Sequence, residues 1–222
     1  MDLHQRTTQF RSRYREGISA RYSGWLHGGF VFGAGGIGML YCFSQTAVQA
    51  QGLSPWHALL VPLALLITNV GEYVAHRQLG HKKRSWAKLF YSRHTGDHHT
   101  FFTHEDYLID NTRDLRVVLF PAFLLVAVAL LVATPLGAFT GWLLGPAAGW
   151  LLAGSLLLGY LMYEFVHLCD HLPASNPLTR LPGVRQMREH HRLHHDPSIA
   201  TEKNFNVTFP LTDYLLGTKY RP

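Results

Sequence analysis

The chain has 222 residues, of which 47% are hydrophobic and only 15% are Asp, Glu, Lys or Arg, against a usual charged share of about 25%. This length gives room for one domain rather than two, and the shortage of charge favours a protein with much lipid-facing surface. The formal net charge is +6, but the basic residues flank apolar stretches, so attraction to anionic lipid headgroups explains them better than nucleic-acid binding. The two cysteines, Cys42 and Cys169, imply no disulfide framework.

Apolar stretches follow one another along the chain and predict four membrane spans, each near the roughly 20 residues that a bilayer requires. A short basic segment, 1–24, comes first and is expected to lie at the membrane interface. The spans themselves are expected at about 25–50, 55–80, 115–134 and 139–168. Histidine-rich segments at 76–114 and 167–222 would then form a helical cap, and 1–222 would be a single membrane-embedded domain.

The basic residues are confined to certain segments: of the 20 Lys and Arg, five lie within 1–24, eight within 77–116 and seven within 180–221. The short connections at 51–55 and 135–141 contain none. Because positive charge marks the cytoplasmic side of a membrane protein, this pattern predicts two hairpins, with both termini and the histidine-rich cap in the cytoplasm. We therefore predict an all-α, multi-pass integral membrane fold.

Twelve of the 15 histidines fall into four clusters at the ends of these apolar runs. Neutral imidazole is the commonest metal ligand near physiological pH, and twelve histidines far exceed the four ligands of a structural zinc site. The pattern predicts two metal ions, although imidazole ligands alone suit zinc, copper, iron or nickel. The clusters are His76 and His81; His94, His98, His99 and His104; His167 and His171; and His190, His191, His194 and His195.

The spacing of the histidines predicts which rings meet, because residues three or four apart share one face of a regular helix. Pairs of this kind are His94 and His98, His167 and His171, His191 and His194, and His191 and His195. His76 and His81 are five apart, which is too wide for one regular face. Gly80 is therefore expected to end the helix, with His81 folding back toward the same centre.

Carboxylates accompany the clusters, and metal-bound imidazoles usually donate their second N–H to such groups. Ionisable residues are also expensive inside membrane segments, which makes those in the spans functional candidates. The candidates for supporting roles are Glu72, Glu164, Asp97 and Asp170. Asp97 and Asp170 could equally face solvent.

Four histidine motifs and a closing segment occur in a fixed order along the chain. The motifs are Glu72-Tyr73-x-x-His76-Arg77-x-x-Gly80-His81, His94-x-x-x-His98-His99, His167-x-x-x-His171 and His191-x-x-His194-His195. The closing segment is Asn204-Phe205-Asn206-Val207-Thr208, followed by residues 210–218. From about residue 55 onward, this set resembles the fatty acid hydroxylase/sterol desaturase superfamily, whose members are membrane-bound, histidine-rich di-iron oxygenases.

The resemblance implies a ligand set, cofactors and partners. The implied ligands are His76, His81, His94, His98, His99, His167, His171, His191, His194 and His195. His104 lies outside the family's usual motifs and His190 is an extra histidine in the last one, so both are weaker candidates. The implied cofactors are two iron ions, which zinc could replace, and O2. The implied partners are a lipid substrate from the bilayer and a separate ferredoxin- or cytochrome b5-like electron donor.

As a function, the resemblance implies an O2-dependent oxidoreductase that hydroxylates a C–H bond of an acyl chain, a sphingoid base or a sterol-like lipid. A lipid desaturase or a carotenoid hydroxylase would use the same di-metal site, and the ligand set does not separate these outcomes. A non-enzymatic metal transporter is disfavoured, because it would need ligands near the bilayer midplane on a path that reaches both faces. The small size and the lack of a retrieval signal lead us to expect a bacterial inner membrane.

Overall fold

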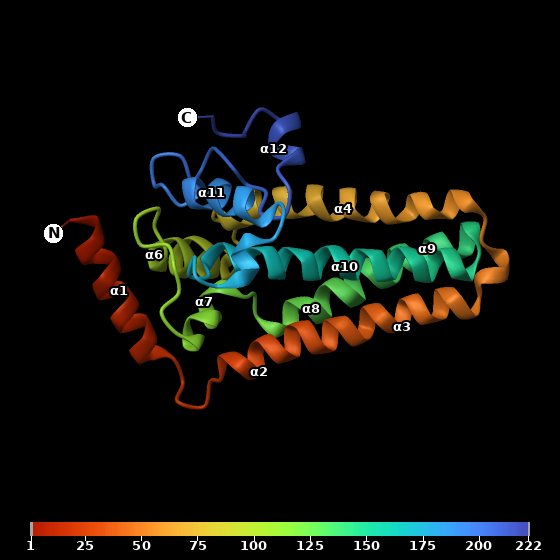
Figure 1. The fold of residues 1–222 in the computed structure, drawn as a ribbon, viewed down its shortest axis with the longest axis horizontal. Helices are drawn as coiled ribbons and strands as arrows, with labels where there is room; N and C mark the ends of the chain where they lie inside the picture. Colours follow the sequence, from red (N-terminus) through yellow and green to blue (C-terminus); the bar gives the residue numbers. More distant parts are fainter. Residues whose placement is uncertain (1, 222) are drawn as a thin grey trace. The chain divides into compact units, whose positions relative to one another are not determined.

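The structure is a computed structural model that describes residues 2–221, and within that range the chain forms helices and no strand (Figure 1). The α-helices of this range are α1 (Leu3–Gly17), α2 (Gly24–Gly29), α3 (Gly35–Val48), α4 (Leu60–Ala75), α5 (Lys88–Tyr91), α6 (His99–Phe101), α7 (Leu115–Val118), α8 (Ala122–Val128), α9 (Thr134–Leu144), α10 (Pro146–His171), α11 (Val184–His194) and α12 (Leu211–Leu215). Short π-helical segments occupy Phe30–Ala34, His76–Gly80, Ser92–His98 and Ala129–Ala133. Short 3-10 segments occupy Ala50–Gly52, Pro55–Leu59, Thr112–Asp114 and Pro177–Arg180.

Within the described range, four helical segments are long and apolar enough to cross a bilayer. They are Gly24–Val48, Pro55–Gly80, Ala122–Leu144 and Pro146–His171. Large apolar side chains such as Ile37, Leu131 and Trp142 remain more than 70% exposed on them, an arrangement that suits contact with lipid and would be unfavourable in water. The chain is a multi-pass integral membrane protein with an all-helical fold, which confirms the predicted fold class.

The third apolar segment differs from its predicted position. It runs to Leu144, whereas the sequence pattern placed the span at 115–134 and a connection at 135–141. Pro135 lies in the first turn of α9, where the missing proline N–H is tolerated. The chain turns instead at Gly145, whose φ of 94° is a conformation that glycine adopts without steric cost. Because the residues on both sides of Pro135 are apolar, hydropathy alone could not place this turn.

The described residues divide into two compact units. The apolar unit consists of Leu26–Asn69 and Phe120–Glu164. The histidine unit consists of the residues up to Trp25, Val70–Leu119 and those from Phe165 onward.

Small residues let helices approach closely inside the apolar unit. A Cβ atom added at Gly149 of α10 would lie 2.5 Å from the carbonyl oxygen of Gly137 and 2.8 Å from the Cα of Gly141, both on α9. Such backbone-to-backbone contact is how helices associate in lipid, where the hydrophobic effect provides little drive. The buried core of this unit is formed by Cys42, Leu60, Ala64, Ala133, Ala148, Leu152, Ala153, Leu156 and Leu157.

The histidine unit has its own small aromatic core beside the clustered histidines. Phe101 and Phe102 are fully buried and pack with Val117 and Val118. The Phe102 ring also stacks on the imidazole of His171, with ring centroids 4.1 Å apart. This packing keeps the histidine side chains away from water.

Candidate metal centre

Nine of the ten implied ligands lie in two groups within the histidine unit. The first group contains His76, His81, His94, His99 and His194, and the second contains His98, His171, His191 and His195. In each group, one ring nitrogen from every histidine lies within 4.8 Å of the others. The tenth implied ligand, His167, is beside the second group, with its Nε2 atom 3.3 Å from Nε2 of His98.

Two π-helical turns decide which histidines of the first two motifs meet. In His76–Gly80 the N–H of His81 donates to the carbonyl of His76 at 3.1 Å, an i to i+5 bond, so residues five apart come onto one face. The helix ends at Gly80, as predicted, and this last π-turn brings His81 onto the same side as His76. The turn Ser92–His98 does the same for His94 and His99, whose Nε2 atoms are 3.0 Å apart.

This geometry corrects the pairing expected from regular helical spacing. His94 and His98 are four apart, yet they belong to different groups. His191 and His194 are also separated, whereas His191 and His195 share the second group, as their spacing predicted. For His94 and His98 the reason is the π-turn, which shifts the register of the helix by one residue, and hydrophobic periodicity does not reveal such a shift.

Backbone carbonyls hold the Nδ1 atoms of five clustered histidines. A carbonyl oxygen can only accept a hydrogen bond, so each Nδ1 must carry the proton and leave Nε2 with a lone pair. Such partners fix the tautomer and ring orientation of metal-binding histidines. The pairs are His76 with Phe205, His98 with Val117 at 3.0 Å, His171 with Tyr107 at 2.7 Å, His194 with Lys203 at 2.7 Å and His195 with Phe102 at 2.9 Å.

The Nε2 atoms left by this arrangement fit metal ions. Nε2 of His98 lies 3.1 Å from Nε2 of His195, and both atoms bear lone pairs that would repel without a cation between them. Two imidazoles bound to one ion at about 2.0–2.1 Å each place their nitrogens about this far apart. The Nε2 atom of His76 is buried and has no hydrogen-bond partner, as expected for an atom that faces a metal.

Burial also keeps the clustered imidazoles neutral, which is the form that binds metals. Outside the membrane-crossing segments, burial lowers the pKa of His98 to about 3. It likewise lowers the pKa values of His94, His99, His191, His194 and His195 well below the usual value of 6.5, and the neighbouring imidazoles lower them further. The site therefore presents neutral ligands at any pH at which the protein would function.

Three of the four candidate carboxylates make contacts other than those expected. Glu72 accepts hydrogen bonds from the backbone and side chains of Asn206–Thr208. Glu164 accepts from the Tyr160 hydroxyl at 2.6 Å and from the Phe120 N–H at 3.3 Å, and Asp97 pairs with Arg93 at 2.9 Å. The carboxylate of Asp170 is fully buried, and neither oxygen has a hydrogen-bond partner.

Both weaker candidates lie outside the two groups. The ring of His190 contacts the carboxylate of Asp213 at 3.2 Å. His104 is half-buried, and its Nε2 atom is 3.9 Å from the carboxylate of Glu105. Neither histidine has a ring nitrogen among those that converge.

Sequence reasoning missed the residues that orient the histidines, because they act through their main chain. Any residue carries a carbonyl, so the identities of Tyr107, Val117 and Phe102 gave no signal. The one available signal was the closing segment that begins at Asn204 and contains Asp213, which the resemblance singled out without assigning it a role.

Four membrane-crossing helices and two buried groups of convergent imidazoles define a histidine-rich membrane metalloprotein. The chain belongs to the fatty acid hydroxylase family, a family of oxidoreductases: the family model described as "Fatty acid hydroxylase" matches residues 61–218.

Two similar proteins were found by comparison. Over 180 residues the chain is 27% identical to the dihydroceramide fatty acyl 2-hydroxylase FAH2 of Arabidopsis thaliana, covering 80% of this chain and 68% of that protein. Among solved structures, it resembles full-length Scs7p, in which only the hydroxylase domain is visible. That likeness has a TM-score of 0.63 at 19% identity and covers 90% of this chain and 67% of the other. It is a likeness of fold.

Proposed function

We propose that the protein is a di-iron oxygenase that hydroxylates a C–H bond of a membrane lipid, using O2 and electrons from a separate donor. The observation that carries the proposal is the pair of imidazole groups with their Nε2 atoms convergent, in a chain of the fatty acid hydroxylase family. Two metal sites side by side suit the reduction of O2 better than the storage of a single ion.

The proposed ligands are the nine grouped histidines together with His167, whose Nε2 lies beside that of His98. Two iron ions held there would supply the activation of O2 that no amino-acid side chain can provide. The protein would supply the rest. The backbone carbonyls aim the imidazoles, and the stacked Phe102 ring keeps water from His171.

We propose an acyl chain as the substrate, because FAH2 is a fatty acyl 2-hydroxylase and because the apolar helices of this chain suit contact with lipid. Sphingoid bases and sterol-like lipids are the other substrates to test. The electron donor would be a small ferredoxin- or cytochrome b5-like protein.

The predicted topology and location belong to the same proposal. All 20 Lys and Arg lie in three segments that flank the spans, which favours a cytoplasmic position for both termini and for the histidine unit. We further propose that the chain acts as one functional domain in a bacterial inner membrane. Labelling of single introduced cysteines in intact cells tests the orientation. Labelling at the connection near Gly52, and not near Lys83, supports it.

The test of function is lipid mass spectrometry on cells that express the chain together with a donor system. Cells expressing His98→Ala and cells expressing His4→Ala provide the comparison, because His98 is buried in the second group and His4 is exposed. A lipid with one added oxygen, lost with His98→Ala and kept with His4→Ala, supports the hydroxylase. Loss of two hydrogens identifies a desaturase instead. Equal product from the wild type and His98→Ala refutes the proposal.

A further inference from the structure

Two backbone carbonyls of one segment, on either side of Asn204, contact histidines of the first group. Asn204 has a φ of 60°, a left-handed conformation that asparagine tolerates better than most residues. On its two sides, the carbonyl of Lys203 accepts from Nδ1 of His194 at 2.7 Å, and the carbonyl of Phe205 accepts from Nδ1 of His76. We call residues 203–220 the strap.

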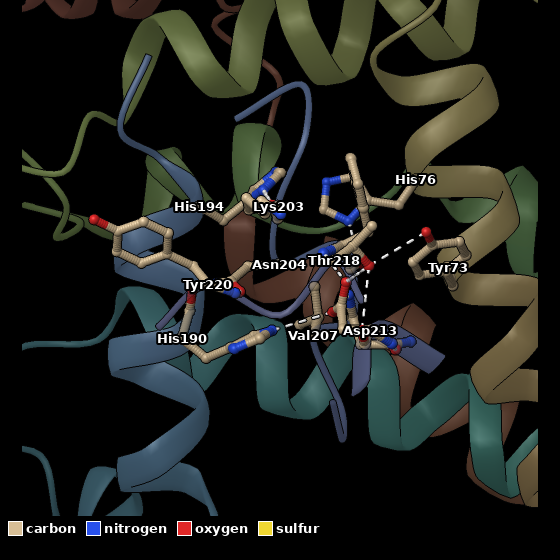
Figure 2. A network of polar contacts seen from close by, with 12 residues as sticks. Tyr73, His76, His190, His194, Lys203, Asn204, Val207, Asp213, Thr218 and Tyr220 are labelled. Carbon is tan, nitrogen blue, oxygen red and sulfur yellow. Dashed lines mark hydrogen bonds and ion pairs between the residues drawn. The ribbon is translucent and has the colours of Figure 1, made fainter. Parts of the chain in front are cut away.

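Asp213 holds the strap in this conformation. Its carboxylate is fully buried and accepts hydrogen bonds from the N–H groups of Phe205 at 2.9 Å and Asn206 at 2.7 Å. It also accepts from the Thr218 hydroxyl at 2.7 Å. Figure 2 shows Asp213 at the centre of this network, between His190 and Thr218, with His76 and His194 beside the same residues.

Two further contacts connect the strap with α4, which leads into His76. The Thr218 hydroxyl lies 3.3 Å from that of Tyr73. Glu72, one turn before His76, accepts from the Thr208 N–H at 3.1 Å and from the Thr208 hydroxyl at 2.6 Å. The side chain of Glu72 therefore acts on the strap rather than on an imidazole.

In the part of the chain that the structure describes, the strap holds no ring nitrogen of the second group; it contacts the neighbouring His190, whose carbonyl accepts from the Asn204 side chain at 2.9 Å and whose ring lies 3.2 Å from the Asp213 carboxylate. The Nδ1 atoms of His98, His171 and His195 face the carbonyls of Val117, Tyr107 and Phe102, which lie in the middle of the chain, and Nδ1 of His191 has no hydrogen-bond partner. The two groups are thus oriented by different segments of the chain. They are nevertheless neighbours, because His94 of the first group and His98 of the second lie on the same π-helical segment, Ser92–His98.

We propose that Asp213 is a positioning residue for the first metal site alone. It fixes the two strap carbonyls that orient His76 and His194, so the metal affinity of the first group depends on Asp213 and that of the second group does not. This inference rests on the di-metal centre of the proposed function. It does not depend on which lipid is oxidised.

The test measures Co²⁺ binding by the full-length protein, purified in detergent and stripped with a chelator. Bound cobalt and its visible absorption are followed in two backgrounds, His191→Ala, which leaves the first group complete, and His99→Ala, which leaves the second. Losing a partner that orients a ligand weakens metal binding about 10–100-fold. Asp213→Asn is expected to weaken Co²⁺ binding by this factor in the first background and to leave it unchanged in the second.

Asp114→Asn is the matched control. Asp114 is also fully buried and accepts backbone N–H bonds, one from Asp110 at 2.9 Å, but it contacts Arg15 and no part of the strap. This variant is expected to leave Co²⁺ binding by the first group unchanged. Thr218→Val removes one hydrogen-bond donor to Asp213 and should also weaken Co²⁺ binding by the first group, but by less than Asp213→Asn. If Asp213→Asn does not fold, Thr218→Val is the variant that tests the role of Asp213.

Two results overturn the inference: unchanged Co²⁺ affinity of the first group, or equal weakening of both groups. A wild-type protein that binds no Co²⁺ overturns the di-metal centre as well. A wild-type protein that binds two Co²⁺ ions but oxidises no lipid contradicts the proposed reaction and leaves the role of Asp213 intact.

Discussion

Gly80 offers the sharpest test of how the first histidine group is built. Gly80 is buried in the π-turn between His76 and His81. A Cβ atom added there would lie 2.7 Å from Cδ2 of His94, 3.2 Å from its Cγ and 3.3 Å from its Nε2. Because all three contacts are with one rigid ring, no small rotation of the His94 ring relieves them.

The size of the effect follows from these distances. Ordinary contact with a Cβ atom begins at 3.4 Å, so the His94 ring must move by roughly 0.7 Å, whereas metal–ligand distances tolerate only about 0.2 Å. Overpacking of this kind destabilises a protein by about 1–3 kcal/mol. We therefore expect Gly80→Ala to fold with reduced stability and to bind metal at the first group at least about 10-fold more weakly, in the range seen when a ligand loses its orientation.

The assay is the Co²⁺ titration in the His191→Ala background, with Gly96→Ala as the control. Gly96 lies in the π-turn that carries His94 and His98, but a Cβ atom there would meet only Ser92, at an ordinary 3.9 Å. Gly96→Ala should bind Co²⁺ like the parent. If Gly80→Ala also binds Co²⁺ with the parent's affinity, the proposed position of His94 in the first group is wrong.

Two other predictions concern stability. Burial lowers the pKa of His98 from 6.5 to about 3, so between these pH values His98 is protonated in the unfolded chain but not in the folded one. The chelator-stripped protein should therefore lose stability as the pH falls from about 6.5 toward 3. An unfolding temperature that stays constant between pH 7 and pH 5 would contradict this prediction. Tyr107→Phe removes the hydrogen bond from the tyrosine hydroxyl to the Arg188 carbonyl at 2.6 Å but keeps the backbone carbonyl that orients His171. It should therefore lower the free energy of unfolding by about 1 kcal/mol and leave the Co²⁺ stoichiometry unchanged, and loss of one bound Co²⁺ per chain would show that the hydroxyl also orients a ligand.

Much of the fold could be predicted from the sequence, because membrane spans depend on local composition. The paucity of charge and the apolar runs were sufficient to identify four spans. The exact turn between the third and fourth spans was not, since apolar residues lie on both sides of Pro135 and hydropathy has no minimum there. The turn at Gly145 depends on a backbone conformation that many glycines could adopt.

The sequence indicated which histidines lie close together, but it did not indicate how they are divided and oriented. Histidine content and motif order indicated the residues that come together, because imidazoles at the ends of apolar runs have few other reasons to be buried. The assignment to groups depended on π-turns at His76–Gly80 and Ser92–His98, and regular helical spacing led to the wrong partner for His94. The carboxylates were expected at the imidazoles, but the nearest partners proved to be backbone carbonyls.

By itself, the sequence determined that this chain crosses a membrane and that it carries histidine clusters able to bind metal, because both properties follow from which side chains are present and in what order. Only the tertiary structure decided how the ligands are divided and oriented. That division depends on the hydrogen-bond register of two helical turns and on main-chain carbonyls from Phe102, Tyr107, Val117, Lys203 and Phe205. A carbonyl is the same in every residue, so its position in space, rather than its identity in the sequence, carries the information.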